Sequence, residues 1–362
     1  MKRLVHQGIE TLKPYPPGKP IEELERELGI KGPIKLASNE NPLGPSPKAL
    51  EAIQASLSGL NRYPDGSAFY LKDAISKHFG LPQEQIVVGN GSNEIIELAI
   101  RTFLLPGEVA VQPYPTFLVY EKMVLAQGGR ILSVPLKDLR LDLRGIREKI
   151  INGVKIVFLN NPNNPTGTHI RQRELVGFLE EIPEDVLVIL DEAYIEFAHD
   201  PNIAKGTSLL ERFENLIVLR TFSKLYGLAG LRIGYGFLPR RLADYVNRVR
   251  QPFNVNTLAQ KAAIAALEDY DFVAKTLKLV REEKAFLYKN LEEMGLKYVP
   301  SQTNFFLVEV GDGEEVYKAM LTQGVIVRSM KAFGLEGFIR ISVGLREENE
   351  RFLNALRRVL KA

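Results

Sequence analysis

The sequence predicts an α/β protein: a large domain built on a mostly parallel, doubly wound, seven-stranded sheet, with a smaller α+β domain and an N-terminal arm. Two observations support this fold. Seven short apolar runs rich in β-branched residues lie at residues 86–88, 109–112, 131–134, 154–160, 186–191, 216–222 and 233–238. They lack period-2 alternation, which suits strands covered on both faces, and helix-like segments such as 92–104 and 171–181 lie between most of them.

The first 35 residues are expected to form an arm that packs on the small domain or on a partner subunit. Residues 14–20 contain four prolines, which favours an extended segment, and residues 21–28 give one short amphipathic helix. The large domain is then expected to span residues 36–255.

The rest of the chain, residues 256–362, is expected to form a linking helix and the small domain. A long helical pattern covers 258–295. Strand-like runs follow at 304–310, 325–328 and 338–343, and a final amphipathic helix ends the chain.

Composition excludes several classes of protein. With 45% hydrophobic and 25% charged residues, the 362-residue chain is globular rather than disordered or fibrous. The net charge of +3 is too small to predict a nucleic-acid partner. No cysteine is present and the four histidines are scattered, so we predict no metal site. Apolar runs are too short for a signal peptide or membrane span, which predicts a cytoplasmic protein and no membrane partner.

The segment TFSKLYGLAGLRIGYG, residues 221–236, follows an apolar strand and holds the main candidate catalytic residue, Lys224. A lysine at the carboxyl end of a strand lies where α/β sheets keep their ligand crevice. Partial desolvation there would lower its pKa toward the neutral amine that Schiff-base chemistry needs. Thr221, Ser223 and Arg232 offer two hydroxyls and a guanidinium suited to a phosphate. Taken alone, however, a Ser-Lys pair is more often an ordinary exposed lysine in a loop.

Two further motifs also end apolar strands. In ILDEAY, residues 189–194, Asp191 can keep a pyridine nitrogen protonated, and Tyr194 can direct its phenol at the same ring. The alternative for Asp191 is a cap on the following helix. In NNPNNPTG, residues 160–167, the prolines fix a turn that presents the amide of Asn164. By itself this motif is only a turn.

Two motifs earlier in the chain suit the same ligand. GNGSNE, residues 89–94, places Ser92 and Asn93 at the start of a helix, where backbone amides form an anion site. A glycine turn with a serine cap fits this pattern equally well. In PYPTF, residues 113–117, the ring of Tyr114 could stack on a planar cofactor, although core packing is the commoner fate of such a residue.

Together and in this order, the five motifs resemble the pyridoxal-5′-phosphate (PLP) aminotransferases of fold type I, over nearly the whole chain. The resemblance implies a PLP-dependent transferase fold, with Lys224 as the Schiff-base lysine and Asp191 on the pyridine nitrogen. It implies Tyr194 and Asn164 on the ring hydroxyl oxygen and Tyr114 stacked on the ring. Around the cofactor phosphate it implies Ser92, Asn93, Thr221, Ser223 and Arg232.

Other segments, including LASNENPLGPSP (36–47), RYPDG (62–66) and FIRISVGLREEN (338–349), resemble the histidinol-phosphate aminotransferases in particular. This resemblance implies that Arg340 binds a substrate carboxylate, and Arg328 the substrate phosphate, with Tyr15 of the arm closing over the site and Asn164 also touching substrate. It implies a homodimer in which Tyr63 reaches the neighbouring subunit's cofactor phosphate. Where that family usually has a threonine, this chain has Leu345, to which we assign no role.

The implied reaction is transamination from L-histidinol phosphate to 2-oxoglutarate, giving imidazole acetol phosphate and glutamate, in histidine biosynthesis. Lys224 would act as the acid–base group, and Asp191 as the charge anchor. Two alternatives within the same fold are an aromatic or broad-specificity amino-acid aminotransferase and a phosphothreonine decarboxylase. An alternative of another class is a non-catalytic PLP-binding module.

Overall fold

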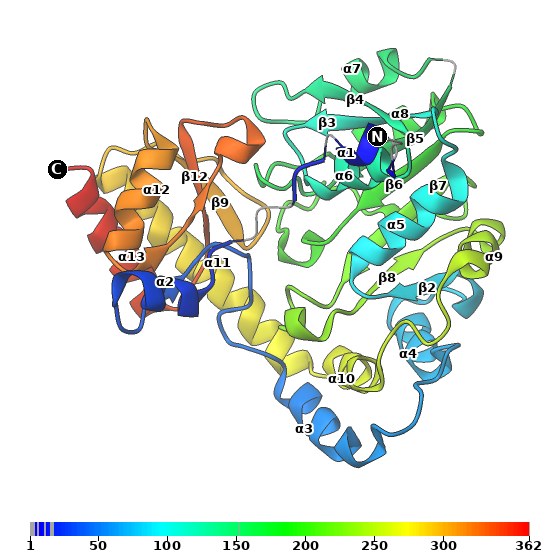
Figure 1. The fold of residues 1–362 in the computed structure, drawn as a ribbon, viewed down its shortest axis with the longest axis horizontal. Helices are drawn as coiled ribbons and strands as arrows, with labels where there is room; N and C mark the ends of the chain where they lie inside the picture. The colour runs from blue at the N-terminus through cyan, green and yellow to red at the C-terminus, as the bar shows by residue number, and fades with distance from the viewer. Residues whose placement is uncertain (1–3, 6, 11, 15–17, 152, 362) are drawn as a thin grey trace.

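The computed structural model describes residues 4–5, 7–10, 12–14, 18–151 and 153–361 (Figure 1). Its centre is a seven-stranded sheet in the order β2-β8-β7-β6-β5-β3-β4. The strands are β2 (Ile86–Gly89), β3 (Val109–Tyr114), β4 (Arg130–Pro135), β5 (Val154–Asn160), β6 (Leu187–Asp191), β7 (Leu216–Thr221) and β8 (Gly234–Phe237). Neighbouring strands are parallel except at β8, which is antiparallel to both β2 and β7. The predicted mostly parallel sheet is confirmed.

The central strands are apolar throughout because both faces of the sheet are covered. Along β5, Ile156 and Phe158 belong to one hydrophobic cluster, whereas Val157 and Leu159 belong to another on the opposite face. All four side chains are fully buried. Alternate residues therefore enter two different cores, which explains why the sequence shows no polar alternation.

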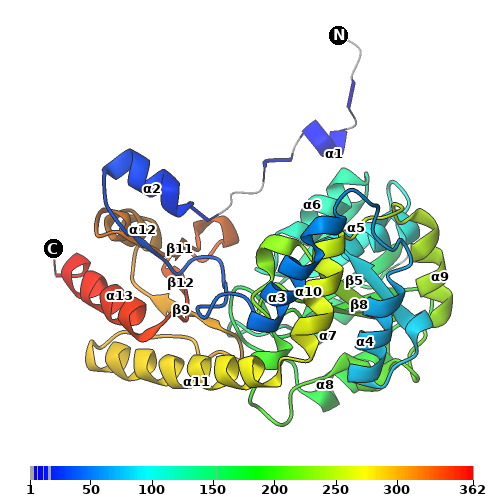
Figure 2. The ribbon, with the colours of Figure 1, turned by 90° about the horizontal axis from the view of Figure 1, so that it is seen from below.

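Helices cover the two faces of this sheet (Figures 1 and 2). One face carries α5 (Ser92–Phe103), α6 (Val119–Ala126) and α9 (Arg240–Val249). The other carries α4 (Phe69–Phe79), α7 (Leu143–Glu148), α8 (Gln172–Glu180) and α10 (Thr257–Leu267), with α3 (Pro47–Ser56) packed on α10. This is the doubly wound arrangement that the sequence predicts.

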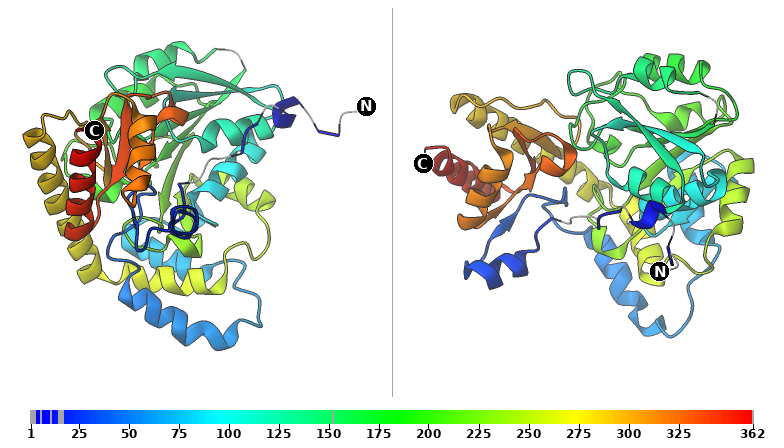
Figure 3. Two further views of the ribbon diagram at one scale, coloured as in Figure 1. Left: turned by 60° about the vertical axis from the view of Figure 1, so that its left-hand side comes forward. Right: turned by 45° about the horizontal axis from the view of Figure 1, so that its top comes forward.

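A second, antiparallel sheet has the order β11-β12-β9. Its strands are β9 (Phe305–Glu309), β11 (Arg328–Ser329) and β12 (Phe338–Ser342), and its helices are α11 (Tyr270–Glu293), α12 (Gly313–Thr322) and α13 (Arg346–Val359). Figure 3 shows the C-terminal helix α13, in red, on the outer side of this sheet, remote from the large sheet. The second sheet and these three helices are called the small domain below, and the part with the seven-stranded sheet is called the large domain.

The N-terminal segment joins the small domain. Strand β1 (Ile34–Lys35) pairs in parallel with β10 (Val325–Ile326). Helix α2 (Ile21–Leu28) packs there too, since Leu24 is buried in one cluster with Ile326. The short helix α1 (Gln7–Glu10) instead contacts α6 of the large domain.

The predicted single helix over 258–295 is two helices in the structure. Helix α10 ends at Leu267, and α11 begins after Asp269, whose carboxylate accepts a hydrogen bond from the backbone N–H of Phe272 as an N-cap. Helix α10 packs on α3 and α4, so it lies with the large domain.

Short 3-10 helices complete the described chain at Leu57–Gly59, Gln83–Gln85, Ile195–Phe197, Gly206–Leu209, Ala229–Leu231 and Lys331–Phe333. Within the described ranges, none of the helices combines the length and apolar character that crossing a membrane requires.

Candidate active site

A cavity of about 160 Å³ opens at the carboxyl ends of β5, β6 and β7, beside the N-terminus of α5. This edge is where α/β sheets bind ligands, because loops leaving parallel strands converge there. The cavity is lined by Gly91, Ser92, Asn93, Phe117, Asn160, Asn164, Asp191, Ala193, Tyr194, Thr221, Ser223, Lys224, Ala229 and Arg232. The structure thus brings most of the predicted site residues together.

Lys224 lines this cavity and is its candidate nucleophile. Its Nζ donates a hydrogen bond to the backbone oxygen of Ser38, 3.1 Å away. Desolvation, helped by the positive charge of Arg340, lowers the pKa of Lys224 to about 8. An appreciable fraction of the amine is therefore neutral near physiological pH, as attack on a carbonyl group requires.

Asp191 supplies a buried carboxylate at the end of β6. One carboxylate oxygen accepts a hydrogen bond from the hydroxyl of Tyr120 at 2.7 Å, and the other accepts one from the backbone N–H of Ala193 at 3.1 Å. Burial raises the pKa of Asp191 to about 6, while both hydrogen bonds oppose that rise. The carboxylate is therefore ionised at neutral pH.

Sequence reasoning missed Tyr120. It is fully buried, and its ring stacks on Phe158 with centroids 4.6 Å apart. Tyr120 follows Phe117 by three residues near the start of α6, so both rings lie on one side of that turn, with centroids 5.5 Å apart. This helical spacing was the available signal.

The Asp191–Tyr120 hydrogen bond leads to a test in solution. As pH falls through about 6, Asp191 takes up a proton and loses the charge that would pair with a pyridinium nitrogen. The affinity of the apoenzyme for PLP is then expected to fall. The Tyr120→Phe variant removes a hydrogen bond that lowers this pKa, so the fall should begin at higher pH. Fluorescence titrations between pH 5 and 8 measure it, and an unshifted profile in Tyr120→Phe contradicts the assignment.

Gly91, Ser92 and Arg232 line the same cavity and form a candidate anion cradle. Gly91 has φ +73°, and a Cβ there would lie 2.7 Å from Nη2 of Arg232, so only glycine lets the guanidinium approach. A Cβ on Gly234 would lie 2.4 Å from the backbone nitrogen of Ser92. Close backbone packing, a helix N-terminus and an arginine are the parts of a phosphate site. These residues fit the phosphate of PLP.

Asn164 also lines the cavity. Its backbone N–H donates to Oδ1 of Asn160 at 2.7 Å, which fixes the turn after β5. Its own Oδ1 accepts a hydrogen bond from Nη1 of Arg340 at 2.5 Å. Arg340 comes from β12 of the small domain and also donates to the backbone oxygen of Ala37 at 2.9 Å. A guanidinium from the second domain is therefore held against the cavity wall.

Tyr114, predicted to stack on the cofactor ring, is not among the residues that line the cavity, whereas Phe117 and Tyr194 are. Tyr114 ends β3 and is 37% exposed, and its hydroxyl faces Gly334 of the small domain. Phe117, three residues after the end of β3, lines the cavity instead.

Other predicted residues lie outside this cavity. Tyr63 is 83% exposed and stacks on Phe253 with centroids 4.9 Å apart. Arg328 stands opposite Arg340 in the β11–β12 pair. Tyr15 falls outside the described residues. Leu345 precedes α13, and its backbone N–H donates to Glu348, which gives it a capping role only.

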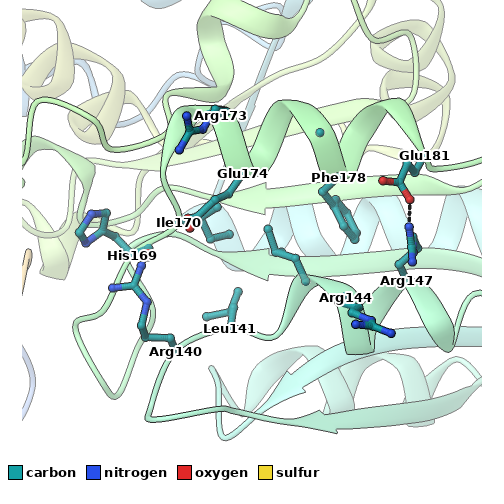
Figure 4. A pocket seen from close by; sticks show the side chains of 12 residues that line it. Arg140, Leu141, Arg144, Arg147, His169, Ile170, Arg173, Glu174, Phe178 and Glu181 are labelled. Carbon is teal, nitrogen blue, oxygen red and sulfur yellow. Dashed lines mark hydrogen bonds and ion pairs between the residues drawn. The ribbon is translucent and has the colours of Figure 1, made fainter.

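A second cavity, of about 440 Å³, lies between α7 and α8 and is rich in arginine (Figure 4). Arg147 forms an ion pair with Glu181, and Arg140 donates to the backbone oxygen of His169 at 3.0 Å. The described residues that line it include neither lysine nor aspartate. The larger cavity is therefore not the candidate active site.

A lysine, a buried aspartate and a phosphate cradle at the carboxyl edge of such a sheet fit the PLP-dependent enzymes of fold type I. Comparison with known proteins gives the family: the model for aminotransferase class I and II matches residues 31–356. The chain belongs to this family of aminotransferases, and its cofactor is PLP.

Individual relatives match almost end to end. The histidinol-phosphate aminotransferase of Desulfotalea psychrophila is 46% identical over 365 residues, covering 100% of this chain and 96% of the relative. That of Moorella thermoacetica is 47% identical, covering 98% and 92%. A crystal structure of histidinol-phosphate aminotransferase from Sinorhizobium meliloti in complex with PLP superposes with a TM-score of 0.92 at 30% identity, covering 99% of this chain and 98% of that one.

Proposed function

We propose that this aminotransferase moves the amino group of L-histidinol phosphate to 2-oxoglutarate, giving imidazole acetol phosphate and glutamate, a step of histidine biosynthesis. The assignment of this substrate depends on one observation: over nearly its whole length, the chain is 46–47% identical to enzymes named histidinol-phosphate aminotransferase. We also propose a cytoplasmic location, as expected for an enzyme of small phosphorylated metabolites.

PLP, when bound, supplies an electron sink for the negative charge that develops at the substrate Cα. Ser92, Asn93, Thr221, Ser223 and Arg232 would hold its phosphate, Phe117 would cover its ring, and Tyr194 and Asn164 would bind its ring hydroxyl oxygen.

The chain's own groups then divide the work. Lys224 Nζ, neutral in part near pH 8, would hold the cofactor, take a proton from the Cα of the amino donor and, in the second half-reaction, supply one to the Cα of the amino acceptor. The Asp191 carboxylate, oriented by Tyr120, would pair its negative charge with the pyridine nitrogen. Arg340, held by Asn164, offers a guanidinium to the carboxylate of glutamate or 2-oxoglutarate. Arg328 and Tyr15 are proposed to bind the phosphate of the other substrate.

A panel of half-reactions tests the substrate. Enzyme loaded with PLP is mixed with histidinol phosphate, phenylalanine or phosphothreonine, and the conversion of the cofactor to its amino form is followed by absorbance. Histidinol phosphate should react with a kcat/KM at least about a hundredfold above that of phenylalanine, because a site built for a polar group strongly rejects analogues that lack it. Equal rates would favour a broad or aromatic aminotransferase, and carbon dioxide released from phosphothreonine would favour a decarboxylase.

We further propose that the active unit is a homodimer formed through a patch on α3, α4 and the segment between them, called here the α3–α4 patch. Its side chains are apolar or aromatic and 49–83% exposed: Leu50, Leu57, Leu60, Tyr63, Phe69 and Tyr70. Contiguous exposed apolar groups of this kind mark protein interfaces. The patch supports a contact in which Tyr63 reaches the partner's cofactor phosphate.

A mixed dimer tests this arrangement. One subunit carries Tyr63→Phe and the other Lys224→Met. If Tyr63 acts across the interface, one site carries both lesions and the other neither, so about half the wild-type activity per dimer should remain. If Tyr63 acts within its own subunit, activity reaches at most half that of the Tyr63→Phe homodimer. The loss of one hydrogen bond, about 0.5–1.5 kcal/mol, makes the two cases separable. Sedimentation of a fully active monomer would contradict the dimer.

A further inference from the structure

Residues 36–41 run between the two domains and touch the active site from both sides. Toward the small domain, the backbone oxygen of Ala37 accepts a hydrogen bond from Arg340. Toward the large domain, the backbone oxygen of Ser38 accepts one from Lys224. This stretch, called here the bridging segment, links the proposed carboxylate-binding arginine to the catalytic lysine.

Asn39 lies near the centre of the bridging segment and forms hydrogen bonds with residues of the small domain. Its backbone N–H donates to Oγ of Ser342 at 2.8 Å, and the same hydroxyl donates to Oδ1 of Asn39 at 3.1 Å. The amide of Asn304 donates to the Asn39 backbone oxygen at 3.1 Å. All three residues are at most 4% exposed. Asn39 is therefore fixed by three hydrogen bonds with Ser342, the last residue of β12, and Asn304, which directly precedes β9.

The backbone of Asn39 is in the left-handed region, with φ +55°. This conformation is unfavourable for residues with a Cβ, and asparagine tolerates it better than most. The side chain lies between the two domains, with Oδ1 toward Ser342 of the small domain and Nδ2 toward Tyr194 of the large one.

The remaining donor of Asn39 meets a residue of the cavity. Its Nδ2 donates to the hydroxyl oxygen of Tyr194 at 3.0 Å. An amide N–H cannot accept a hydrogen bond, so the phenolic proton must point away from Asn39. The Tyr194 ring is held edge-on to Phe305, with centroids 5.0 Å apart and an interplanar angle of 81°. Ring packing and the Asn39 amide together leave the phenol little freedom.

We propose that Asn39 is a positioning residue: held by Ser342 and Asn304 of the small domain, it sets the hydroxyl of Tyr194 so that its proton faces the cofactor cavity. A movement of the small domain would therefore change the orientation of the Tyr194 hydroxyl, the group proposed to contact the cofactor. The proposal requires PLP at this site but does not depend on which amino donor the enzyme uses.

The test follows the visible absorbance of the lysine-bound cofactor as pH is varied. A hydrogen bond donated to the ring oxygen stabilises its negative charge and favours the deprotonated form of the chromophore. Tyr194→Phe should therefore raise the apparent pKa of the absorbance change by about one unit, the size expected for a lost hydrogen bond to a charged group. Asn39→Gly, which keeps the left-handed backbone and removes the amide, should raise it by a smaller amount. It should also weaken PLP binding by the apoenzyme several-fold.

The double variant Asn39→Gly/Tyr194→Phe should behave as Tyr194→Phe alone, because Asn39 acts through that hydroxyl. Asn41→Ala is the matched control: Asn41 is a buried asparagine of the same segment that bonds to Leu225 and Thr276, so its loss should leave the absorbance pKa in place. An unchanged pKa in Asn39→Gly or in Tyr194→Phe, or additive shifts in the double variant, would overturn the proposal.

If Asn39→Gly fails to fold, the Asn39→Asp variant tests whether Asn39 orients the Tyr194 hydroxyl. The carboxylate can still accept from Ser342, but it also accepts the phenolic proton and turns it away from the cavity. The absorbance pKa should then rise at least as far as in Tyr194→Phe, and no rise would refute the assignment.

Discussion

Replacing Lys224 by methionine is expected to abolish the covalent link to PLP and to lower transamination by roughly 10³–10⁴-fold or more. Methionine keeps the apolar stem but removes the amine that must attach the cofactor and move the proton. PLP should still bind, because the cradle around Arg232 is intact. Borohydride reduction followed by peptide mass spectrometry reads out the link directly. A cofactor adduct on Lys224 should be found in the wild type, and none at position 224 in the variant.

Lys284 provides a matched control. It is also buried, its pKa is likewise lowered to about 8 by desolvation, and its Nζ donates to the backbone oxygens of Ser301 and Thr303. Lys284→Met leaves these two oxygens without that donor and should cost about 1–3 kcal/mol of folding stability. The adduct on Lys224 should persist. If Lys284→Met instead abolished the adduct while the protein stayed folded, a lowered pKa would be the wrong basis for choosing Lys224.

Replacing Asp191 by asparagine is expected to be the next most damaging change. The amide has nearly the same shape but lacks the negative charge, so a pyridinium nitrogen would be left unpaired in a buried site. Breaking a buried pair costs about 3–5 kcal/mol, which corresponds to a loss of turnover on the order of a hundred- to several-thousandfold.

Comparison with Tyr120→Phe separates charge from geometry at this position. That variant keeps the carboxylate and loses only the 2.7 Å hydrogen bond, so at pH 8 its turnover should stay within about tenfold of the wild type. Steady-state turnover at pH 8 with saturating PLP measures both variants. Near-normal activity in Asp191→Asn would remove Asp191 as the charge anchor.

That Asp191 and Lys224 line one cavity was predictable from their positions near the ends of strands. Asp191 ends β6, and Lys224 comes three residues after β7. Parallel strands place their carboxyl ends at one edge, so their motifs had to meet there. The seven-stranded sheet was predictable for a related reason, because residues such as Phe158 show the apolar character of strands buried on both faces.

Other features depend on tertiary geometry that the local pattern does not carry. One such feature is that Phe117 rather than Tyr114 lines the cavity. Asn39 meets Ser342 across 303 positions in the sequence, and neither residue has a local signal for the other. The break between α10 and α11 was recoverable, since Asp269 precedes α11 as an N-cap.

The pairing of β1 with β10 makes the small domain discontinuous along the chain. Ile34 lies opposite Val325, and Leu24 shares a cluster with Ile326. The small domain supplies Arg340 and Arg328, the residues proposed to select substrates. It therefore cannot be exchanged between relatives as one contiguous cassette. A chimaera with a foreign C-terminal part needs the matching segment from the front of the chain, so substitutions at the two ends are expected to be inherited together.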